Sequence, residues 1–222
     1  MITTIDVETS YQKTENGGMD PSPFNPQNIL VSVGINDEYY FTNHSERIDE
    51  GCYHKIQKIL DDTKLLIGHN LKFDLSWLLE SGFKYNGRVY DTMLGEYILN
   101  RGIRKSLTLQ MCCQRRKIGA KDDRIKEWMD RGISFENIPA DIVEEYGKID
   151  VAITRKLFDS QMEDLRADKN KHLLKTVKMM NEFLIVLTDM ERNGININLE
   201  DLSQVEKEYR AEYAYLKQKI DK

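Results

Sequence analysis

The sequence predicts an α/β protein, with a mixed β-sheet flanked by helices and a helical extension at its C-terminal end. Two observations support this fold class. Short β-branched and apolar runs, typical of strands, recur in the first third of the chain. Apolar residues at helical spacing lie between and after these runs, and strands interleaved with helices in this way are typical of a sheet covered on its faces.

The first half of the chain alternates strand and helix patterns. Residues 1–5 are β-branched and predict the first strand, whereas residues 10–27 are rich in Gly, Pro and Asn and predict a surface loop. The other predicted elements are a strand pair over residues 29–35 and 39–42, a helix over about 50–60, and a strand over 64–68 that leads into a helix reaching Leu79.

The second half of the chain is predicted to be helical. Apolar residues recur at helical spacing over residues 142–158, over 171–191 and over 199–220, where Asn198 can cap the last helix. We expect residues 1–162 to form one domain and residues 163–222 a helical extension, given usual domain sizes. The apolar stripe of the last helix is predicted to form an exposed seam.

Composition and charge restrict the class of protein. Of the 222 residues, 40% are hydrophobic and 31% are charged, as in soluble globular proteins. No apolar run approaches the ~20 residues that span a membrane, and the chain opens on a strand, so we expect no signal peptide and a cytoplasmic location. The net charge of -5 argues against binding of long duplex DNA by charge alone. The cysteines and histidines lack the spacing of a disulfide framework or a zinc site.

Two acidic residues follow the first predicted strand. Asp6 and Glu8 are two residues apart, so an extended backbone places both carboxylates on one face. Like charges this close repel each other unless a cation lies between them, and oxygen ligands of this kind suit Mg²⁺ or Mn²⁺. A solvated polar strand end is the alternative explanation for this pair taken alone.

Three further residues are candidates for the same site. Asp74 falls in the first turns of a predicted helix, where the helix dipole alone would also favour an acidic residue. Tyr146 and Asp150 are four residues apart, on one face of a helix, so a phenol and a carboxylate can share a small volume. A structural tyrosine next to a salt-bridged aspartate is the alternative explanation for that pair.

Taken in this order, these motifs resemble the Tyr-type DEDD family of 3′-5′ exonucleases. They are most similar to the proofreading domain of family A DNA polymerases, above all of the phage branch. The matching stretches, over roughly residues 1–160, are Asp6-Val7-Glu8-Thr9, Asn70-Leu71-Lys72-Phe73-Asp74, residues 89–94 through Leu99-Asn100, Ser106-Leu107, Ile133-Ser134-Phe135, and Tyr146 with Asp150. Residues 187–197 resemble the segment that leads such polymerases into the thumb. Since the chain ends before a palm or fingers, we expect a piece of a polymerase or the product of a split gene.

The resemblance implies a ribonuclease H-like fold and a metal-dependent exonuclease that trims single-stranded or frayed DNA 3′ ends during replication. Two divalent ions, Mg²⁺ or Mn²⁺, are expected. Asp6, Glu8 and Asp150 would hold one ion, and Asp6 would share the second with Asp74, directly or through water. Tyr146 would orient the attacking water by hydrogen bonding.

The resemblance also implies contacts with substrate and partner. Thr9, Asn70 and Phe73 would line the pocket for the terminal nucleotide. A separate polymerase subunit, or a polymerase domain beyond this chain, would be the protein partner, in the host cytoplasm if the gene is phage-encoded. Basic residues that could form a local patch for nucleic acid are Arg115, Arg116, Lys117, Lys121 and Arg124, with Lys72 close to the site in sequence.

Two alternatives remain open at this point. The first is an RNA 3′-trimming exonuclease of the same superfamily, against which the thumb-like segment after Leu187 argues. The second is a catalytically silent docking module for a separate polymerase chain, with the acids kept only as structure. Cleavage of DNA compared with RNA tests the first alternative, and metal titration tests the second.

Overall fold

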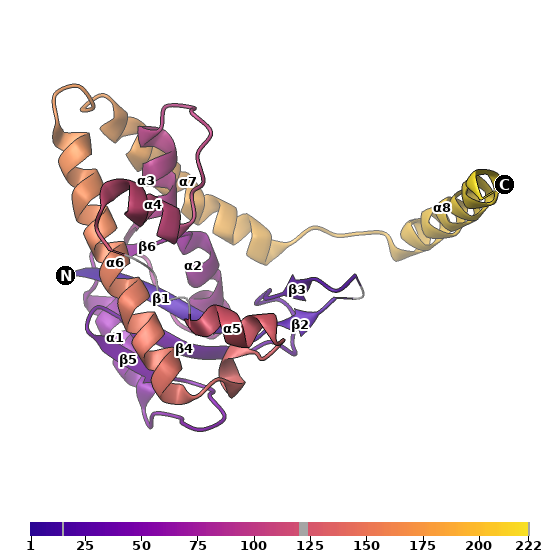
Figure 1. The fold of residues 1–222 in the computed structure, drawn as a ribbon, viewed down its shortest axis with the longest axis horizontal. Coiled ribbons are helices and arrows are strands. Elements are labelled where there is room, and N and C mark those ends of the chain that lie inside the picture. The colour runs from indigo at the N-terminus through magenta and orange to yellow at the C-terminus, as the bar shows by residue number, and fades with distance from the viewer. Residues whose placement is uncertain (15, 120–123, 222) are drawn as a thin grey trace. The chain divides into compact units, whose positions relative to one another are not determined.

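The structure, a computed structural model, describes residues 1–14, 16–119 and 124–221 and contains two compact units (Figure 1). The first unit is Met1–Thr188 and the second is Asp189–Lys222. The first unit holds a mixed sheet with helices on its faces, which confirms the predicted fold class. The predicted domain boundary between residues 162 and 163 stays a prediction.

A five-stranded mixed sheet forms the centre of the first unit. Its strands are β1 (Ile2–Thr9), β4 (Leu30–Ile35), β5 (Glu38–Phe41), β6 (Leu65–Gly68) and β7 (Arg88–Asp91), in the order β5-β4-β1-β6-β7. The central strand, β1, pairs antiparallel with β4 and parallel with β6. The helix α2 (Leu71–Glu80) connects the parallel strands β6 and β7. The short strand β7 is not predicted by the sequence pattern, because four residues carry too little periodicity.

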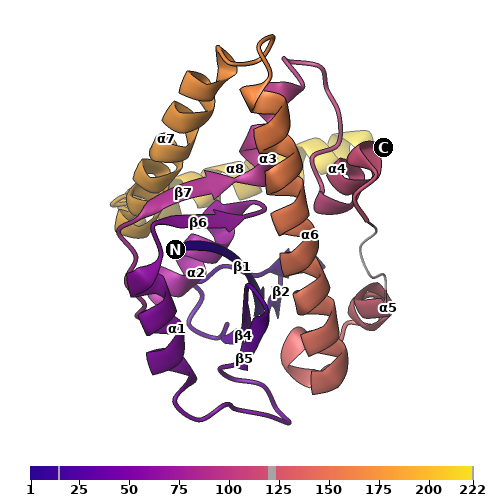
Figure 2. The same ribbon diagram turned by 90° about the vertical axis from the view of Figure 1, so that its left-hand side faces the viewer.

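Helices cover both faces of the sheet (Figure 2). The 27-residue helix α6 (Ala140–Arg166) lies on one face, where it contacts β1, β4, β5 and β6. On the other face, α1 (Cys52–Asp62) and α2 enclose a core with buried residues such as Ile5, Leu66 and Leu78. The remaining helices of this unit are α3 (Thr92–Leu99), α4 (Leu109–Arg116), α5 (Arg124–Asp130), the 3-10 helix η1 (Phe135–Asn137) and α7 (Leu173–Asn193) as far as Thr188.

Two predicted boundaries near the N-terminus are wrong. The strand β1 continues past Ile5 as far as Thr9, because Asp6 pairs with Gly34 and Glu8 with Ser32 in the ladder with β4. Both acids therefore lie within the strand. The predicted loop over residues 10–27 contains a small antiparallel hairpin, β2 (Gln12–Lys13) and β3 (Met19–Asp20).

The second unit consists of the end of α7 and the helix α8 (Leu199–Ile220). The Asn198 side chain caps α8 by accepting hydrogen bonds from the Glu200 and Asp201 N–H groups, as predicted. The structure describes all of α8, and within the second unit none of its residues is buried. The exposed seam along its apolar stripe stays a prediction. Over residues 1–14, 16–119 and 124–221, no helix is long and apolar enough to cross a membrane.

Candidate active site

Two carboxylates of the candidate site come from the central strand β1. Asp6 is half-buried and Glu8 is buried. Asp6 and Glu8 pair with Gly34 and Ser32 of β4, so the ladder between these two strands fixes the backbone that carries the acids. The two acids therefore lie on the same face of one rigid strand, as the alternation predicts.

The third carboxylate, Asp74, belongs to the first turn of α2, as predicted. It is only 3% exposed, and its Oδ1 accepts a hydrogen bond from the Val7 N–H at 3.0 Å. Burial raises the pKa of Asp74 well above its ordinary value, the negative charge of Asp6 adds to the increase, and the Val7 N–H opposes it. The carboxylates of α2 and β1 thus repel each other, and a cation between them would relieve that repulsion.

Helix α6 supplies Tyr146 and Asp150, which are both buried and joined by a side-chain hydrogen bond. Burial raises the pKa of Tyr146 far above its ordinary value, and the charges of Glu8, Asp150 and Asp6 raise it further. The phenol therefore stays protonated at neutral pH. A neutral phenol beside carboxylates can donate one hydrogen bond and accept another.

Two glycines let α6 lie close enough to the sheet to bring these groups together. A Cβ atom added at Gly34 on β4 would lie 2.9 Å from Val151 Cγ2, and one at Gly147 would lie 2.3 Å from Tyr39 Cε2. Any side chain at Gly147 would therefore push the helix away from the strands. The close approach of α6 to the sheet depends on these two residues.

The five predicted residues lie on three elements that pack together, because α2 and α6 both contact β1 and Asp74 accepts a hydrogen bond from the β1 backbone. The charges of Asp6 and Glu8 act on Tyr146, and the charge of Asp6 acts on Asp74. Within the described part of the chain, no three His, Cys, Asp or Glu side chains form a group that could hold a metal ion as they lie. The donors are nevertheless carboxylate oxygens, which hard divalent cations prefer. The chemistry of the donors therefore suits such an ion, and the ligand assignment stays a prediction.

The three predicted nucleotide-binding residues lie next to these acids in the chain. Thr9 is buried at the end of β1, and Phe73 is half-buried against the core beneath α2. Asn70 is exposed and adopts a left-handed backbone conformation, with a φ of 62°, at the start of α2. Its side chain makes no capping hydrogen bond to the helix, so its amide is available for another contact. A nucleotide-binding role for all three residues stays a prediction.

Asp91 organises the site, although the sequence pattern does not single it out. Its carboxylate accepts hydrogen bonds from the N–H groups of Asn70 at 3.0 Å, Leu71 at 3.2 Å and Met93 at 2.8 Å, so it caps α2 and α3 together. Burial raises its pKa to about 6, against the effect of these N–H groups. An aspartate directly before an apolar helical run is an N-cap signal that could have located it.

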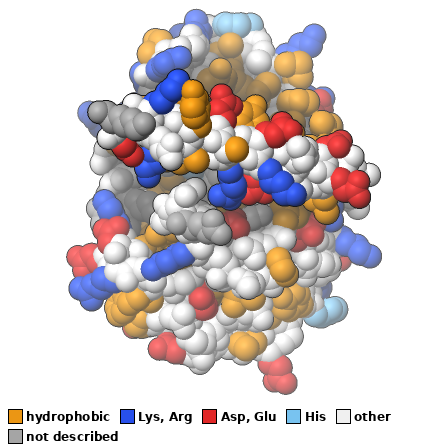
Figure 3. All heavy atoms as spheres, turned by 90° about the vertical axis from the view of Figure 1, so that its right-hand side faces the viewer, with side chains coloured by type: hydrophobic (Ala, Val, Ile, Leu, Met, Phe, Trp, Pro, Cys, Tyr) orange, Lys and Arg blue, Asp and Glu red, His pale blue; other side chains and the backbone are white. Residues whose placement is uncertain are grey.

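Two arginines of the predicted basic patch are engaged within the protein. Arg115 and Arg116 both pair with Glu96, at 3.3 Å and 2.9 Å. Lys117 is exposed at the end of α4, whereas Lys121 and the Arg124 side chain lie outside what the structure describes. On the face drawn in Figure 3, Lys and Arg side chains are interspersed with Asp and Glu side chains.

Comparison with known proteins decides the family. Residues 12–166 match the model of the 3′-5′ exonuclease domain of family A DNA polymerases. The chain belongs to this exonuclease family. The match confirms the predicted resemblance, and the matched stretch contains Asp74, Tyr146 and Asp150 but begins after Asp6 and Glu8.

Relatives of this exonuclease chain include bacterial and phage polymerases. DNA polymerase I of Borreliella burgdorferi is 27% identical over 148 residues, which are 67% of this chain and 16% of that protein. The DNA polymerase of Bacillus phage SP01 is 26% identical over 217 residues, which are 91% of this chain and 23% of that protein. The chain thus spans less than a quarter of the length of these two curated relatives.

Solved structures share the fold of the exonuclease chain. Brucella melitensis NrnC with bound Mg²⁺ has a TM-score of 0.61 and 17% identity, and the match covers 87% of this chain and 86% of that chain. The POL domain of Pol1 from M. smegmatis, in complex with DNA primer-template and dNTP, has a TM-score of 0.60 and 14% identity, over 92% of this chain and 31% of that chain. Both likenesses support the ribonuclease H-like fold.

Proposed function

We propose that this chain removes nucleotides one at a time from the 3′ end of single-stranded or frayed DNA, by metal-dependent hydrolysis, as the proofreading part of a DNA polymerase. The observation that carries the proposal is the packing of α2 and α6 against β1, which gathers Asp74, Tyr146 and Asp150 around the strand of Asp6 and Glu8. Family membership supports nuclease chemistry. The Mg²⁺ bound to NrnC, a protein of the same fold, supports a divalent ion.

The carboxylates and the phenol have distinct roles in this mechanism. Asp6, Glu8 and Asp150 would hold one divalent ion, and Asp6 with Asp74 a second. When bound, such ions lower the pKa of a water molecule and stabilise the leaving 3′ oxygen. Tyr146 is too weak an acid to act as a phenolate, so it orients the attacking water by hydrogen bonding.

Preference for single strands follows from the cost of opening a duplex end. A mismatched primer end costs less to unpair than a matched one, so an enzyme that accepts only an unpaired end removes errors first. Thr9, Asn70 and Phe73 would hold the terminal nucleotide. The exposed amide of Asn70, held on a left-handed backbone at the edge of the site, supports this role.

A polymerase domain or subunit is the proposed partner. The relatives that match are named DNA polymerases, and one of them is a phage enzyme, which supports replication in a host cytoplasm. The neighbour NrnC, which has also been solved bound to pGG, matches nearly its whole length to this chain. That observation makes short oligonucleotides, including RNA, the competing substrate class to test.

The decisive experiment is degradation of a 5′-labelled single-stranded DNA oligonucleotide with Mg²⁺, Mn²⁺ or EDTA, wild type beside Asp6→Ala. We expect a shortening ladder that requires metal and disappears in the variant, while circular dichroism shows an unchanged fold. Cleavage by Asp6→Ala at the wild-type rate would contradict the metal-ligand assignment. No ladder from the wild type with either metal would favour the docking module.

Matched substrates then test the specificity. The same assay with an RNA strand of equal sequence, and with the DNA strand in a matched duplex, should give slower cleavage in both cases. Equal rates on single-stranded and matched duplex DNA would argue against a proofreading role. Faster cleavage of RNA would assign the chain to RNA 3′ trimming.

A further inference from the structure

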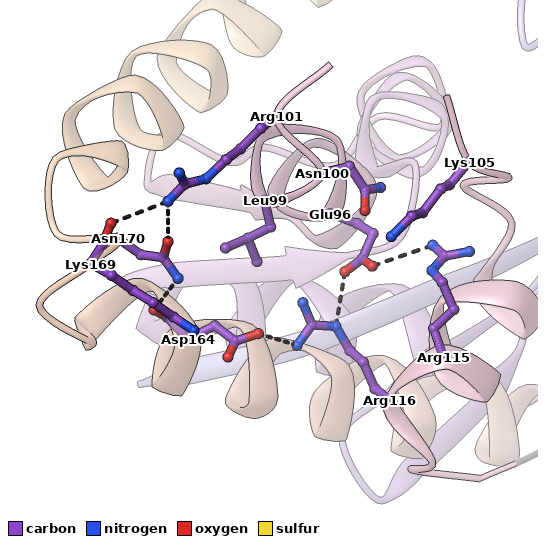
Figure 4. Close-up of a pocket in the computed structure, with 10 residues that line it drawn as sticks. All are labelled: Glu96, Leu99, Asn100, Arg101, Lys105, Arg115, Arg116, Asp164, Lys169 and Asn170. Carbon is purple, nitrogen blue, oxygen red and sulfur yellow. Dashed lines mark hydrogen bonds and ion pairs between the residues drawn. The ribbon is translucent and has the colours of Figure 1, made fainter. Parts of the chain in front are cut away.

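A second polar pocket lies at the far end of α6 from the candidate active site. Its volume is about 550 Å³, within the range of ligand-binding pockets, and it lies where α3, α4, α6 and the loops after α3 and α6 meet (Figure 4). Asp164, in its wall, is fourteen residues beyond Asp150 on the same helix, which corresponds to about 21 Å along the axis. The pocket is therefore separate from the carboxylates of the active site.

The pocket is positively charged although the chain is acidic. Five cationic side chains and two acidic ones line it, a formal charge of +3 in a chain of net charge -5. These charged residues are Arg101, Lys105, Arg115, Arg116, Lys169, Glu96 and Asp164. Cations gathered at a concave surface raise the local concentration of anions.

Internal ion pairs fix the two arginines of α4 in the wall. The Arg116 guanidinium pairs with Glu96 at 2.9 Å and with Asp164 at 2.7 Å, and Arg115 pairs with Glu96 at 3.3 Å. Gln161 Nε2 donates a further hydrogen bond to Glu96 at 3.1 Å. This network holds the floor of the pocket rigid before any ligand enters.

Two lysines on the rim of the pocket carry positive charges that are not paired with acidic groups of the described residues. Lys105 and Lys169 are exposed, and neither ammonium group has an ion-pair or hydrogen-bond partner within residues 1–14, 16–119 and 124–221. Figure 4 shows Lys105 reaching from its loop toward Glu96 and Arg115. A lysine acts as a point charge that can follow a phosphate.

Two nitrogen donors of the wall also lack partners. Asn100 Nδ2 and Arg115 Nε are buried without a hydrogen-bond acceptor among the described residues. Buried donors are usually satisfied, and each exception calls for a physical reason. An anionic oxygen is the kind of acceptor that these two donors lack.

We propose that this pocket binds a nucleotide phosphate group. A phosphate presents several acceptor oxygens. The pocket offers donors for them: two arginines held by ion pairs, and, among the described residues, two lysines without ion-pair partners and two nitrogen donors without acceptors. The phosphate belongs either to the nucleic-acid strand upstream of the cleaved 3′ end or to a free mononucleotide. The first source rests on the proposed exonuclease function, whereas the second does not.

The test is equilibrium binding by the full chain in EDTA, so that no strand is cut. Fluorescence anisotropy follows a labelled single strand of roughly ten nucleotides, and calorimetry follows a 5′-deoxymononucleotide and inorganic phosphate. The double variant Lys105→Gln/Lys169→Gln should weaken binding of at least one phosphate ligand about tenfold or more. Lys105→Arg/Lys169→Arg should retain binding, and Lys58→Gln on the exposed side of α1 is the matched control.

The outcomes distinguish a strand phosphate from a free nucleotide, and both from a purely structural role of the two lysines. Weaker binding of the strand alone, with a salt-dependence slope reduced by about one per lysine, identifies a strand phosphate. Weaker binding of the mononucleotide identifies a free nucleotide. Unchanged binding of every ligand overturns the proposal, and a loss of thermal stability without a loss of binding means that the lysines only offset the C-terminal ends of helices. Cleavage of a dinucleotide, too short to reach the pocket, tests the exonuclease function independently.

Discussion

Asp74 and Glu96 are buried carboxylates in neighbouring helices of one unit, but the protein holds them in opposite ways. Asp74 is 3% exposed and Glu96 is 4% exposed. Glu96 pairs with two arginines and accepts a hydrogen bond from Gln161. Asp74 accepts a hydrogen bond from the Val7 N–H, and burial, together with the charges of Asp6 and Asp91, raises its pKa.

The difference separates a structural carboxylate from one suited to bind a ligand. The charge of Glu96 is compensated by the protein itself, so the ion pairs lock α3, α4 and α6 together. Within the described residues Asp74 has no cationic partner, and its environment favours the protonated form unless a cation arrives. Burial alone does not mark an acid as a candidate for function, whereas burial beside like charges does.

The largest expected effect is a loss of cleavage when Asp74 is replaced. Asp74→Asn should reduce cleavage of single-stranded DNA at least ~10³-fold, because a neutral amide cannot replace a carboxylate next to a divalent ion. The fold should persist in EDTA, since the amide oxygen can still accept the Val7 N–H bond. Rates on a 5′-labelled strand, with thermal unfolding in parallel, check both parts. Wild-type cleavage by this variant would remove Asp74 from the site.

Replacement of Glu96 should show the opposite result, a loss of stability with little loss of cleavage. Glu96→Gln should lower the free energy of unfolding by about 3 kcal/mol, because Arg115 loses its carboxylate and Arg116 keeps only the half-exposed Asp164. Cleavage by the folded fraction should stay close to wild type. Chemical denaturation measures the stability, and Asp159→Asn, which removes an exposed ion pair with Arg155 within α6, is the control that should cost less than ~0.5 kcal/mol. A variant that is stable but inactive would reverse the comparison.

The local part of this comparison was predictable from the sequence. Period-two alternation puts Asp6 and Glu8 on one face, although the strand was predicted to end before them, and helical spacing places the other three candidate residues on α2 and α6. Those signals depend on neighbours a few residues apart. Their order along the chain also leads to the exonuclease family, which the family match confirms.

The long-range part was not predictable. Glu96 meets Gln161 across a separation of 65 residues, and Asn70 meets Asp91 across 21, and no periodic pattern records such pairs. The arginines of α4 therefore resemble a solvated basic patch in sequence but are engaged in the fold. The strand β7 and the hairpin of β2 and β3 were missed for a related reason, since each is two to four residues long and is defined by its pairing partner.

Metal and pH should act on Asp74 in a coupled way. In EDTA, the raised pKa of Asp74 and the pKa of Asp91 at about 6 mean that the folded state binds more protons than the unfolded state above about pH 4. The contribution of these groups to the free energy of unfolding is therefore full below about pH 4. It is lost as pH rises through the folded-state pKa of each group, which is about 6 for Asp91. Mg²⁺ at about 100 times its Kd should restore about 2.7 kcal/mol near pH 7.5 and less near pH 5, where protons compete.

Thermal unfolding at both pH values, with Mg²⁺ or EDTA, measures this coupling. Asp74→Asn should abolish most of the metal effect, whereas Glu96→Gln should lower the melting temperature and leave the metal-dependent increase intact. An equal metal effect in wild type and Asp74→Asn would place the ion elsewhere.

The smallest expected effect is that of removing the neutral phenol hydroxyl of Tyr146. Tyr146→Phe keeps the ring that packs 6.1 Å from the Phe135 ring centroid but removes the hydroxyl that bonds Asp150. Cleavage should fall ~10- to 10²-fold, the low end of what a positioned acid-base group contributes. Because the pKa of Tyr146 is raised, the wild-type rate between about pH 7 and 9 should show no tyrosine titration. Tyr97→Phe, at an exposed position on α3, is the control. A loss as complete as that of Asp6→Ala would mean that the phenol does more than orient water.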